Sequence, residues 1–292
     1  MSRDTTCLPP DPHPVKPAIS LPPGACDAHC HVFGPPARFP YAADRSYTPP
    51  DAPVEKLRAL HALLGISRAV IVHASCHGSE MDVTLDAIAS SAGSYRGVAV
   101  VEESVTDAEL ARLHAGGIRG IRFNFVKHLG GVPDLAVFYR MLSRIKPMGW
   151  HIVLHFDAGD LLEQQVLLAR IDVPFIIDHM GRVNAADGLA QKPFQSLLAL
   201  YRNNPLAWIK ISGAERVSAG KRPFRDAVPF AQALVETDAS RLLWGTDWPH
   251  PNITRDMPND GELVNLLGEI CPDAAVRARI VVDNPTRMYF SS

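Results

Sequence analysis

Two histidines separated by one residue end a short apolar run near the start of the chain. His29 and His31 lie in the segment GACDAHCHVFGPPARFPY, residues 24–41, directly before a break rich in glycine and proline. Alternate residues of a β-strand point to the same side, so both imidazoles can converge where the strand stops. Because imidazole binds metals, moves protons and polarises carbonyl groups, this spacing indicates a chemical site.

Polar side chains also follow most of the later β-branched runs. The main candidates at or near the ends of these runs are Ser75, Arg122, His155, His179, Arg216 and Asp247. If the runs are parallel strands of one barrel, their carboxyl ends meet at a single rim, where barrel enzymes place their active sites. Four histidines (His29, His31, His155 and His179) with Asp247 at one rim favour a functional cluster.

Other ionisable residues have plainer interpretations. Asp178 precedes His179, and strand alternation predicts that the two point to opposite faces, so we interpret Asp178 as structural. We interpret four further histidines as structural or surface residues: His61, His73, His114 and His151.

Three arginines, Arg122, Arg182 and Arg216, lie at or just beyond expected strand ends. The planar guanidinium group suits two-point capture of a carboxylate. A single arginine commonly serves as a structural ion-pair partner. Three on one rim favour a substrate that carries several carboxylates.

The elements that must position these residues alternate along the chain. Eight short apolar runs begin near residues 26, 69, 96, 118, 151, 174, 207 and 241, and amphipathic patterns at 54–65, 107–117, 134–149 and 224–238 lie between them. This alternation predicts an α/β fold, a (β/α)8 TIM barrel. A doubly wound nucleotide-binding sheet is disfavoured because DAHCHVFG stands where a glycine-rich phosphate turn would follow the first strand.

The length of 292 residues suits one domain, which we place at 24–292. Residues 1–23 form an expected extended arm, since 13 of the 25 prolines lie within the first 53 residues. A net charge of −2 disfavours nucleic-acid and membrane partners. Five cysteines without C-x-x-C spacing, and no apolar leader, predict a cytoplasmic protein without a disulfide framework.

The motifs DAHCH, IDHMGR and WGTDWPHP resemble those of the amidohydrolase superfamily. Together with ASCHG and GIRFNF, they resemble the 2-pyrone-4,6-dicarboxylate lactonases of aromatic-compound degradation, from about Gly24 to Tyr289. The resemblance implies a barrel that opens a cyclic ester by adding water. It places the catalytic positions on His29, His31, His179 and Asp247, and it implies no required metal.

The chemistry of these residue types agrees with that assignment. Asp247 can take a proton from water as a general base, while the histidines polarise the ester carbonyl and stabilise the developing oxyanion. By the same resemblance the expected substrate contacts are Arg122, Arg182, Arg216, Tyr47 and Ser75.

The chain departs from the lactonase pattern at two positions. His128 stands where another arginine is expected, and His155 stands where a tyrosine is expected on the fifth strand. Both remain candidate substrate contacts, although the charge of His128 depends on pH. His155 also completes a set of three nitrogens and one oxygen, with His29, His31 and Asp247, that suits a single zinc ion.

Three functions remain open on the sequence. The leading one is hydrolysis of a dicarboxylate or tricarboxylate lactone, most concretely 2-pyrone-4,6-dicarboxylate, with muconolactone-type or sugar lactones as alternatives. The second is a zinc-dependent decarboxylase of the amidohydrolase type. The third is a barrel that binds acidic metabolites without catalysis.

Overall fold

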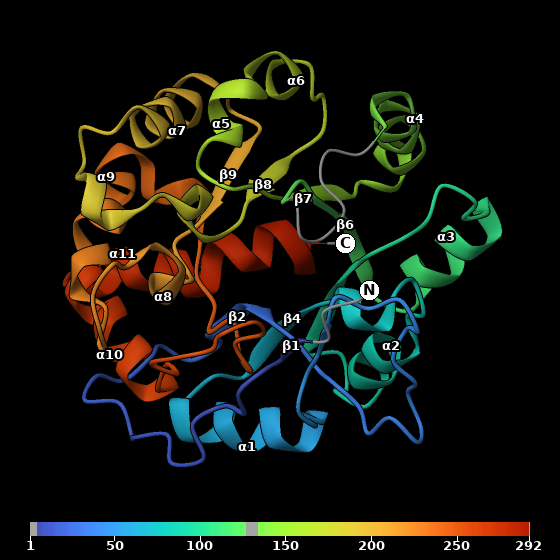
Figure 1. Ribbon diagram of the computed structural model, residues 1–292, viewed down its shortest axis with the longest axis horizontal. Coiled ribbons are helices and arrows are strands. Elements are labelled where there is room, and N and C mark those ends of the chain that lie inside the picture. Colours follow the sequence, from blue (N-terminus) through green and yellow to red (C-terminus); the bar gives the residue numbers. More distant parts are fainter. Residues whose placement is uncertain (1–4, 127–133, 292) are drawn as a thin grey trace.

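Eight parallel strands form the barrel that the sequence predicts. The computed structural model describes residues 5–126 and 134–291, and Figure 1 shows the helices arranged around the strands. The strands are β2 (Cys26–Cys30), β4 (Arg68–Val72), β5 (Tyr95–Ala99), β6 (Ile118–Asn124), β7 (His151–His155), β8 (Phe175–Ile177), β9 (Ala207–Lys210) and β10 (Leu242–Leu243). They pair in the order β10-β9-β8-β7-β6-β5-β4-β2.

The first and last strands meet through backbone hydrogen bonds. The amide of Ala28 donates to the carbonyl of Trp244 at 2.9 Å, and the amide of Asp247 donates to the carbonyl of His29 at 2.8 Å. The barrel therefore closes beside the first histidine motif, where β2 meets the segment that follows β10.

Helices cover the outer face of the strands. They are α1 (Val54–Leu64), α2 (Asp82–Ala89), α3 (Asp107–Ala115), α4 (Leu135–Ile145), α5 (Asp160–Glu163), α6 (Gln165–Ala169), α7 (Lys192–Asn203), α8 (Ala214–Val217), α9 (Val228–Asp238), α10 (Asp260–Ile270) and α11 (Ala274–Ala278). After α11 the chain continues in the helical segments Arg279–Asp283 and Thr286–Phe290. The four helical patterns predicted from the sequence correspond to α1, α3, α4 and α9.

Helix α4 illustrates how local sequence forms these elements. The side chain of Asp134 accepts hydrogen bonds from the amides of Ala136 and Val137, which caps the first turn. The residues buried on one face recur at helical spacing, namely Phe138, Met141, Leu142 and Ile145.

Two apolar cores hold the barrel. One lies inside it, where alternate strand residues such as Val70, Val98, Val153 and Ile176 pack together with Tyr289. The larger core lies between the strands and the helices. Because the interior below the rim is filled by apolar side chains, polar groups gather at the carboxyl ends of the strands.

The described part of the N-terminal arm contacts both β3 (Tyr47–Thr48), which precedes α1, and the region of α10. Strand β1 (Thr5–Thr6) pairs with β3, and the amides of Val15 and Ala18 donate to the side chains of Asn259 and Asn265. All five cysteines are buried. Within residues 5–126 and 134–291, no helix is long and apolar enough to span a bilayer.

Candidate active site

Asp247 lies at the centre of a cluster of imidazoles just after β10. Its Oδ1 atom is 3.2 Å from Nε2 of His31, 3.5 Å from Nε2 of His29 and 3.8 Å from Nε2 of His179. Its Oδ2 atom accepts two hydrogen bonds from Arg216, at 3.1 Å from Nε and 2.7 Å from Nη2. The structure thus brings together the four residues that the sequence analysis assigns to catalysis.

The charges around Asp247 keep its carboxylate ionised. Burial alone would raise its pKa, but Arg216 and the surrounding histidines outweigh burial and hold the pKa of Asp247 well below its usual range. Arg216 donates only to Oδ2, and Oδ1 is the oxygen that faces the imidazoles.

Backbone and side-chain contacts fix the orientation of two of the histidine rings. Nδ1 of His31 is 2.7 Å from the carbonyl of Val72, which can only accept, so this nitrogen donates and Nε2 faces Asp247. Nδ1 of His179 is 3.1 Å from Oγ of Ser212. Burial lowers the pKa of His179 to about 4, so its ring is neutral at pH 7.

Glycines make room for two of these rings. A Cβ atom on Gly213, whose φ is +70°, would lie 2.5 Å from Nδ1 of His179. A Cβ atom on Gly245 would lie 2.4 Å from the backbone nitrogen of His29. Both contacts are closer than side chains tolerate, so glycine permits the close packing that assembles the cluster.

A cavity with about 750 Å³ of empty space, including its open mouth, lies above this cluster. Nine of the predicted residues line it: His31, Tyr47, Ser75, Arg122, His155, His179, Arg182, Arg216 and Asp247. Pro251 and Asn252 complete the wall. His29 is fully buried and is absent from this wall, so it acts from behind Asp247. His128 lies outside the described residues.

The three predicted carboxylate-binding arginines differ in their own partners. Arg216 is held by Asp247, and Nη2 of Arg122 is 3.0 Å from Oδ2 of Asp178. Nη1 of Arg182 donates to Nε2 of His155 at 3.1 Å, and its Nε is 3.3 Å from the partly exposed Asp157. Of the three arginines, Arg182 is therefore the one whose carboxylate partner is partly exposed rather than buried. Nε of Arg122 has no hydrogen-bond partner within the described residues.

Asp178 and Lys210 form a buried charged pair that the sequence analysis did not place in the site. Nζ of Lys210 is 3.1 Å from Oδ1 of Asp178 and 3.1 Å from Nδ1 of His29. The prediction that strand alternation turns Asp178 away from His179 is wrong in its premise, because β8 ends at Ile177 and His179 has a φ of +49°. Lysine within the apolar run AWIKIS was the available signal for Lys210.

His155 uses both ring nitrogens within the protein. Nδ1 lies 3.2 Å from Oδ1 of Asn124, and Nε2 accepts from Arg182. Burial, followed by the charge of Arg122, lowers the pKa of His155 well below its usual range. The structure therefore does not bring His155 into the zinc set predicted from the sequence.

A different set of donors lies close enough to hold a cation. Among the described residues, ligand atoms of His29, His179 and Asp247 lie within 4.8 Å of one another, and their types suit zinc. A divalent ion held there would act as a Lewis acid toward a carbonyl oxygen. Two cations oppose it, because Arg216 contacts Asp247 and Lys210 contacts His29.

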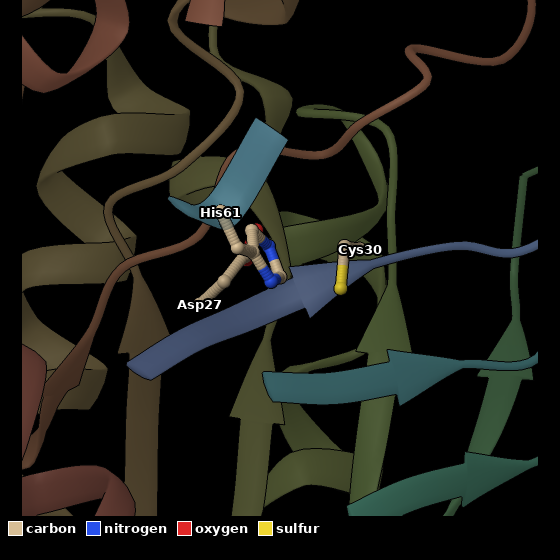
Figure 2. Close-up of side chains that lie close together, drawn as sticks. All are labelled: Asp27, Cys30 and His61. Atoms are coloured by element: carbon tan, nitrogen blue, oxygen red, sulfur yellow. The ribbon is translucent and has the colours of Figure 1, made fainter. Parts of the chain in front are cut away.

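A second buried cluster supports the site from behind β2. Figure 2 shows His61 reaching from α1 to Asp27, with Cys30 further along the strand. Oδ2 of Asp27 accepts from Oγ1 of Thr246 at 2.6 Å and lies 3.2 Å from Nε2 of His61, while Oδ1 accepts the amides of His29 and Thr246 at 3.0 Å. Asp27 thereby ties the first histidine strand to the residue that precedes Asp247.

The model of the amidohydrolase family matches residues 26–290, a range that includes all eight strands of the barrel. The chain belongs to the amidohydrolase family. This amidohydrolase is 43% identical to a 2-pyrone-4,6-dicarboxylate hydrolase of Comamonas testosteroni, over 95% of this chain and 94% of that protein. It is 45% identical to a 4-sulfomuconolactone hydrolase of Rhizobium radiobacter, over 93% of this chain and 92% of that protein.

A solved structure supports the same fold for the amidohydrolase. A probable 2-pyrone-4,6-dicarboxylic acid hydrolase from Acinetobacter baumannii, with citric acid bound, matches with a TM-score of 0.78 and 26% identity. The match covers 91% of this chain and 99% of that one.

Proposed function

We propose that this amidohydrolase hydrolyses a lactone that carries carboxylate groups, with 2-pyrone-4,6-dicarboxylate as the expected substrate. The observation that carries the proposal is the Asp247 carboxylate, which lies within 3.8 Å of three imidazoles and lines a cavity that also contains Arg122 and Arg182. A base, N–H donors and anion-binding groups in one cavity match the needs of ester hydrolysis on an anionic substrate.

Asp247 activates the water. Its Oδ1 takes a proton from a water molecule as the water oxygen bonds to the lactone carbonyl carbon. His179 lines the cavity beside Oδ1 and, with Nδ1 accepting from the Ser212 hydroxyl, donates its Nε2–H to the carbonyl oxygen as negative charge develops on it. The His31 ring completes the wall beside Oδ1. The bond from that carbon to the ring oxygen then breaks, and the proton held by Asp247 passes to the departing oxygen.

Cationic and neutral donors on the wall hold the carboxylates. Arg122 and Arg182 line the cavity and offer N–H groups to one carboxylate. Tyr47 and Ser75 offer hydroxyl groups, and burial raises the pKa of Tyr47 well above its usual range, so it stays a neutral donor. His128 is a further proposed contact.

The proposed reaction requires no metal. Lys210 lies 3.1 Å from His29 and Arg216 lies 2.7 Å from Asp247, so two of the three candidate ligands already have a cationic neighbour. Like charges at such short range disfavour a divalent ion. These side chains supply the positive charge that a metal would otherwise provide.

A second candidate substrate is 4-sulfomuconolactone, favoured by the 45% identity to the hydrolase named for it. Sulfonate and carboxylate are both anions that arginine binds. The two candidates therefore differ in ring and substituent rather than in the chemistry of ester cleavage.

A substrate panel tests the proposal. Purified protein, treated with a chelator and measured for residual metal, is given 2-pyrone-4,6-dicarboxylate, 4-sulfomuconolactone and an uncharged lactone, and ring opening is followed by absorbance. We expect turnover of a charged lactone and none with Asp247→Asn. Turnover of only the uncharged lactone, or of none of the three, would refute the proposed function.

A further inference from the structure

Lys210 is a fully buried lysine whose ammonium group contacts the site from behind. It ends β9, has no solvent exposure and does not line the cavity. Its Nζ atom has two close polar neighbours, Oδ1 of Asp178 and Nδ1 of His29, each at 3.1 Å. The mechanism above uses neither Lys210 nor Asp178 directly, so their role at this position requires a separate explanation.

The contact with Lys210 determines which nitrogen of His29 carries a proton. An imidazole whose Nδ1 accepts a hydrogen bond is neutral and has its one N–H group on Nε2. An ammonium group can only donate, so Nδ1 must accept and the proton must lie on Nε2. Oδ1 of Asp178 lies 3.3 Å from Nδ1, slightly further away than Nζ of Lys210.

The protonated nitrogen faces the proposed base. Nε2 of His29 is buried, has no hydrogen-bond partner within the described residues, and lies 3.5 Å from Oδ1 of Asp247. With its proton on Nε2, His29 turns a positive N–H edge toward the carboxylate. With its proton on Nδ1, the same ring would turn a lone pair toward the carboxylate and would be ready to ligate a metal.

We propose that Lys210 is a positioning residue that holds His29 in the Nε2–H tautomer, so that His29 supports the Asp247 carboxylate and is prevented from acting as a metal ligand. This inference rests on the proposed function for the role of Asp247. The tautomer itself depends only on the contacts of Lys210.

The proposal predicts what happens when the ammonium group is removed. In Lys210→Met, Nδ1 of His29 loses its donor and can donate to Oδ1 of Asp178 at 3.3 Å. The lone pair then moves to Nε2. A carboxylate bound to the outer nitrogen of a histidine is the usual support of a metal-ligating imidazole, and losing such support costs roughly 10- to 100-fold in metal affinity or activity. We therefore expect Lys210→Met to bind zinc roughly 10- to 100-fold more tightly than the wild type.

The first measurement is the ¹⁵N spectrum of histidine-labelled wild-type protein at pH 7, without substrate, with His29 assigned by comparison with His29→Gln. We expect a protonated Nε2 and an unprotonated Nδ1. The reverse pattern would overturn the proposal. Because this measurement uses wild-type protein, its outcome does not depend on whether a Lys210 variant folds.

The second measurement compares Lys210→Met with Arg122→Met, the matched control. Arg122 contacts the other oxygen of Asp178 at 3.0 Å, so its loss removes a neighbouring positive charge but leaves the Lys210–His29 contact intact. We expect the proton to move to Nδ1, and zinc binding to tighten, in Lys210→Met alone. An unchanged tautomer in folded Lys210→Met, or equal zinc gains in both variants, would refute the proposal.

Kinetics give a third readout on a lactone that the wild type hydrolyses. Because Lys210 and His29 lie behind the cavity wall, metal-free Lys210→Met should lose roughly 10- to 100-fold in kcat with KM unchanged. A raised KM with an unchanged kcat would refute the positioning role. If no lactone is hydrolysed, the proposed function fails, while the tautomer and zinc results still decide the role of Lys210.

Discussion

Replacing His250 with glutamine should remove a pH dependence from the stability of the protein. His250 has no solvent exposure and lies between two carboxylates, with Nε2 3.2 Å from Oδ1 of Asp260 and Nδ1 3.7 Å from Oε1 of Glu215. Burial alone would lower its pKa. The two carboxylates outweigh burial and raise the pKa of His250 to about 10, so the folded protein holds a buried imidazolium ion.

The size and sign of the effect follow from proton linkage. The pKa of His250 is raised in the folded state from an unfolded value of 6.5, so its stabilising contribution is fully present below pH 6.5 and is lost as the pH rises toward 10. Between pH 6.5 and 8.5 the shift corresponds to a loss of about 2 kcal/mol in the free energy of unfolding.

Urea unfolding of reduced protein at pH 6.5 and 8.5 measures this loss. We expect the decrease in the wild type to exceed the decrease in His250→Gln by about 2 kcal/mol. Buried thiols that ionise on unfolding also change the stability with pH, but they do so equally in wild type and His250→Gln, so the difference between the two proteins cancels their contribution. His151→Gln is the matched control, since burial lowers the pKa of His151 to about 3 and its folded-state charge does not change in this window. Equal decreases in wild type and His250→Gln would refute the reasoning.

Four further predictions concern activity. Asp247→Asn should lower kcat by roughly 10²- to 10⁴-fold with the fold retained by circular dichroism, because an amide cannot accept the water's proton, and near wild-type kcat would remove Asp247 from the mechanism. Arg182→Met should raise KM roughly 10-fold or more, and should raise it less for a substrate that lacks the carboxylate bound by Arg182. An equal rise in KM for both substrates would show that Arg182 does not bind that carboxylate. In Arg216→Met the pKa of Asp247 should rise, so the decrease of kcat/KM at acidic pH should begin at a higher pH than in the wild type. An unchanged pH for that decrease would contradict this prediction. His155→Tyr should keep much of the activity without zinc, and elemental analysis showing zinc lost together with activity would argue for a metal mechanism.

The sequence by itself determined the fold and the edge of the barrel at which the chemistry occurs. Alternating apolar runs and amphipathic patterns are local signals, and the eight predicted strands are those of the barrel. Parallel strands bring their carboxyl ends together, so the types and positions of His31, His179 and Asp247 were enough to predict that they meet. The structure places their rings and carboxylate within 3.8 Å.

Only the tertiary structure decided how the charges pair. Arg122 and Arg216 line the cavity, and each also contacts a buried carboxylate, Asp178 and Asp247 respectively, in a pairing that the sequence did not indicate. Lys210 gave no periodic signal, because its contact with His29 joins residues 181 positions apart in sequence. Ion pairs form across strands whose register and tilt depend on the closed barrel, and local sequence does not contain that information. The protonated nitrogen of each imidazole depends on such neighbours, so the residue types were predictable and their chemical states were not.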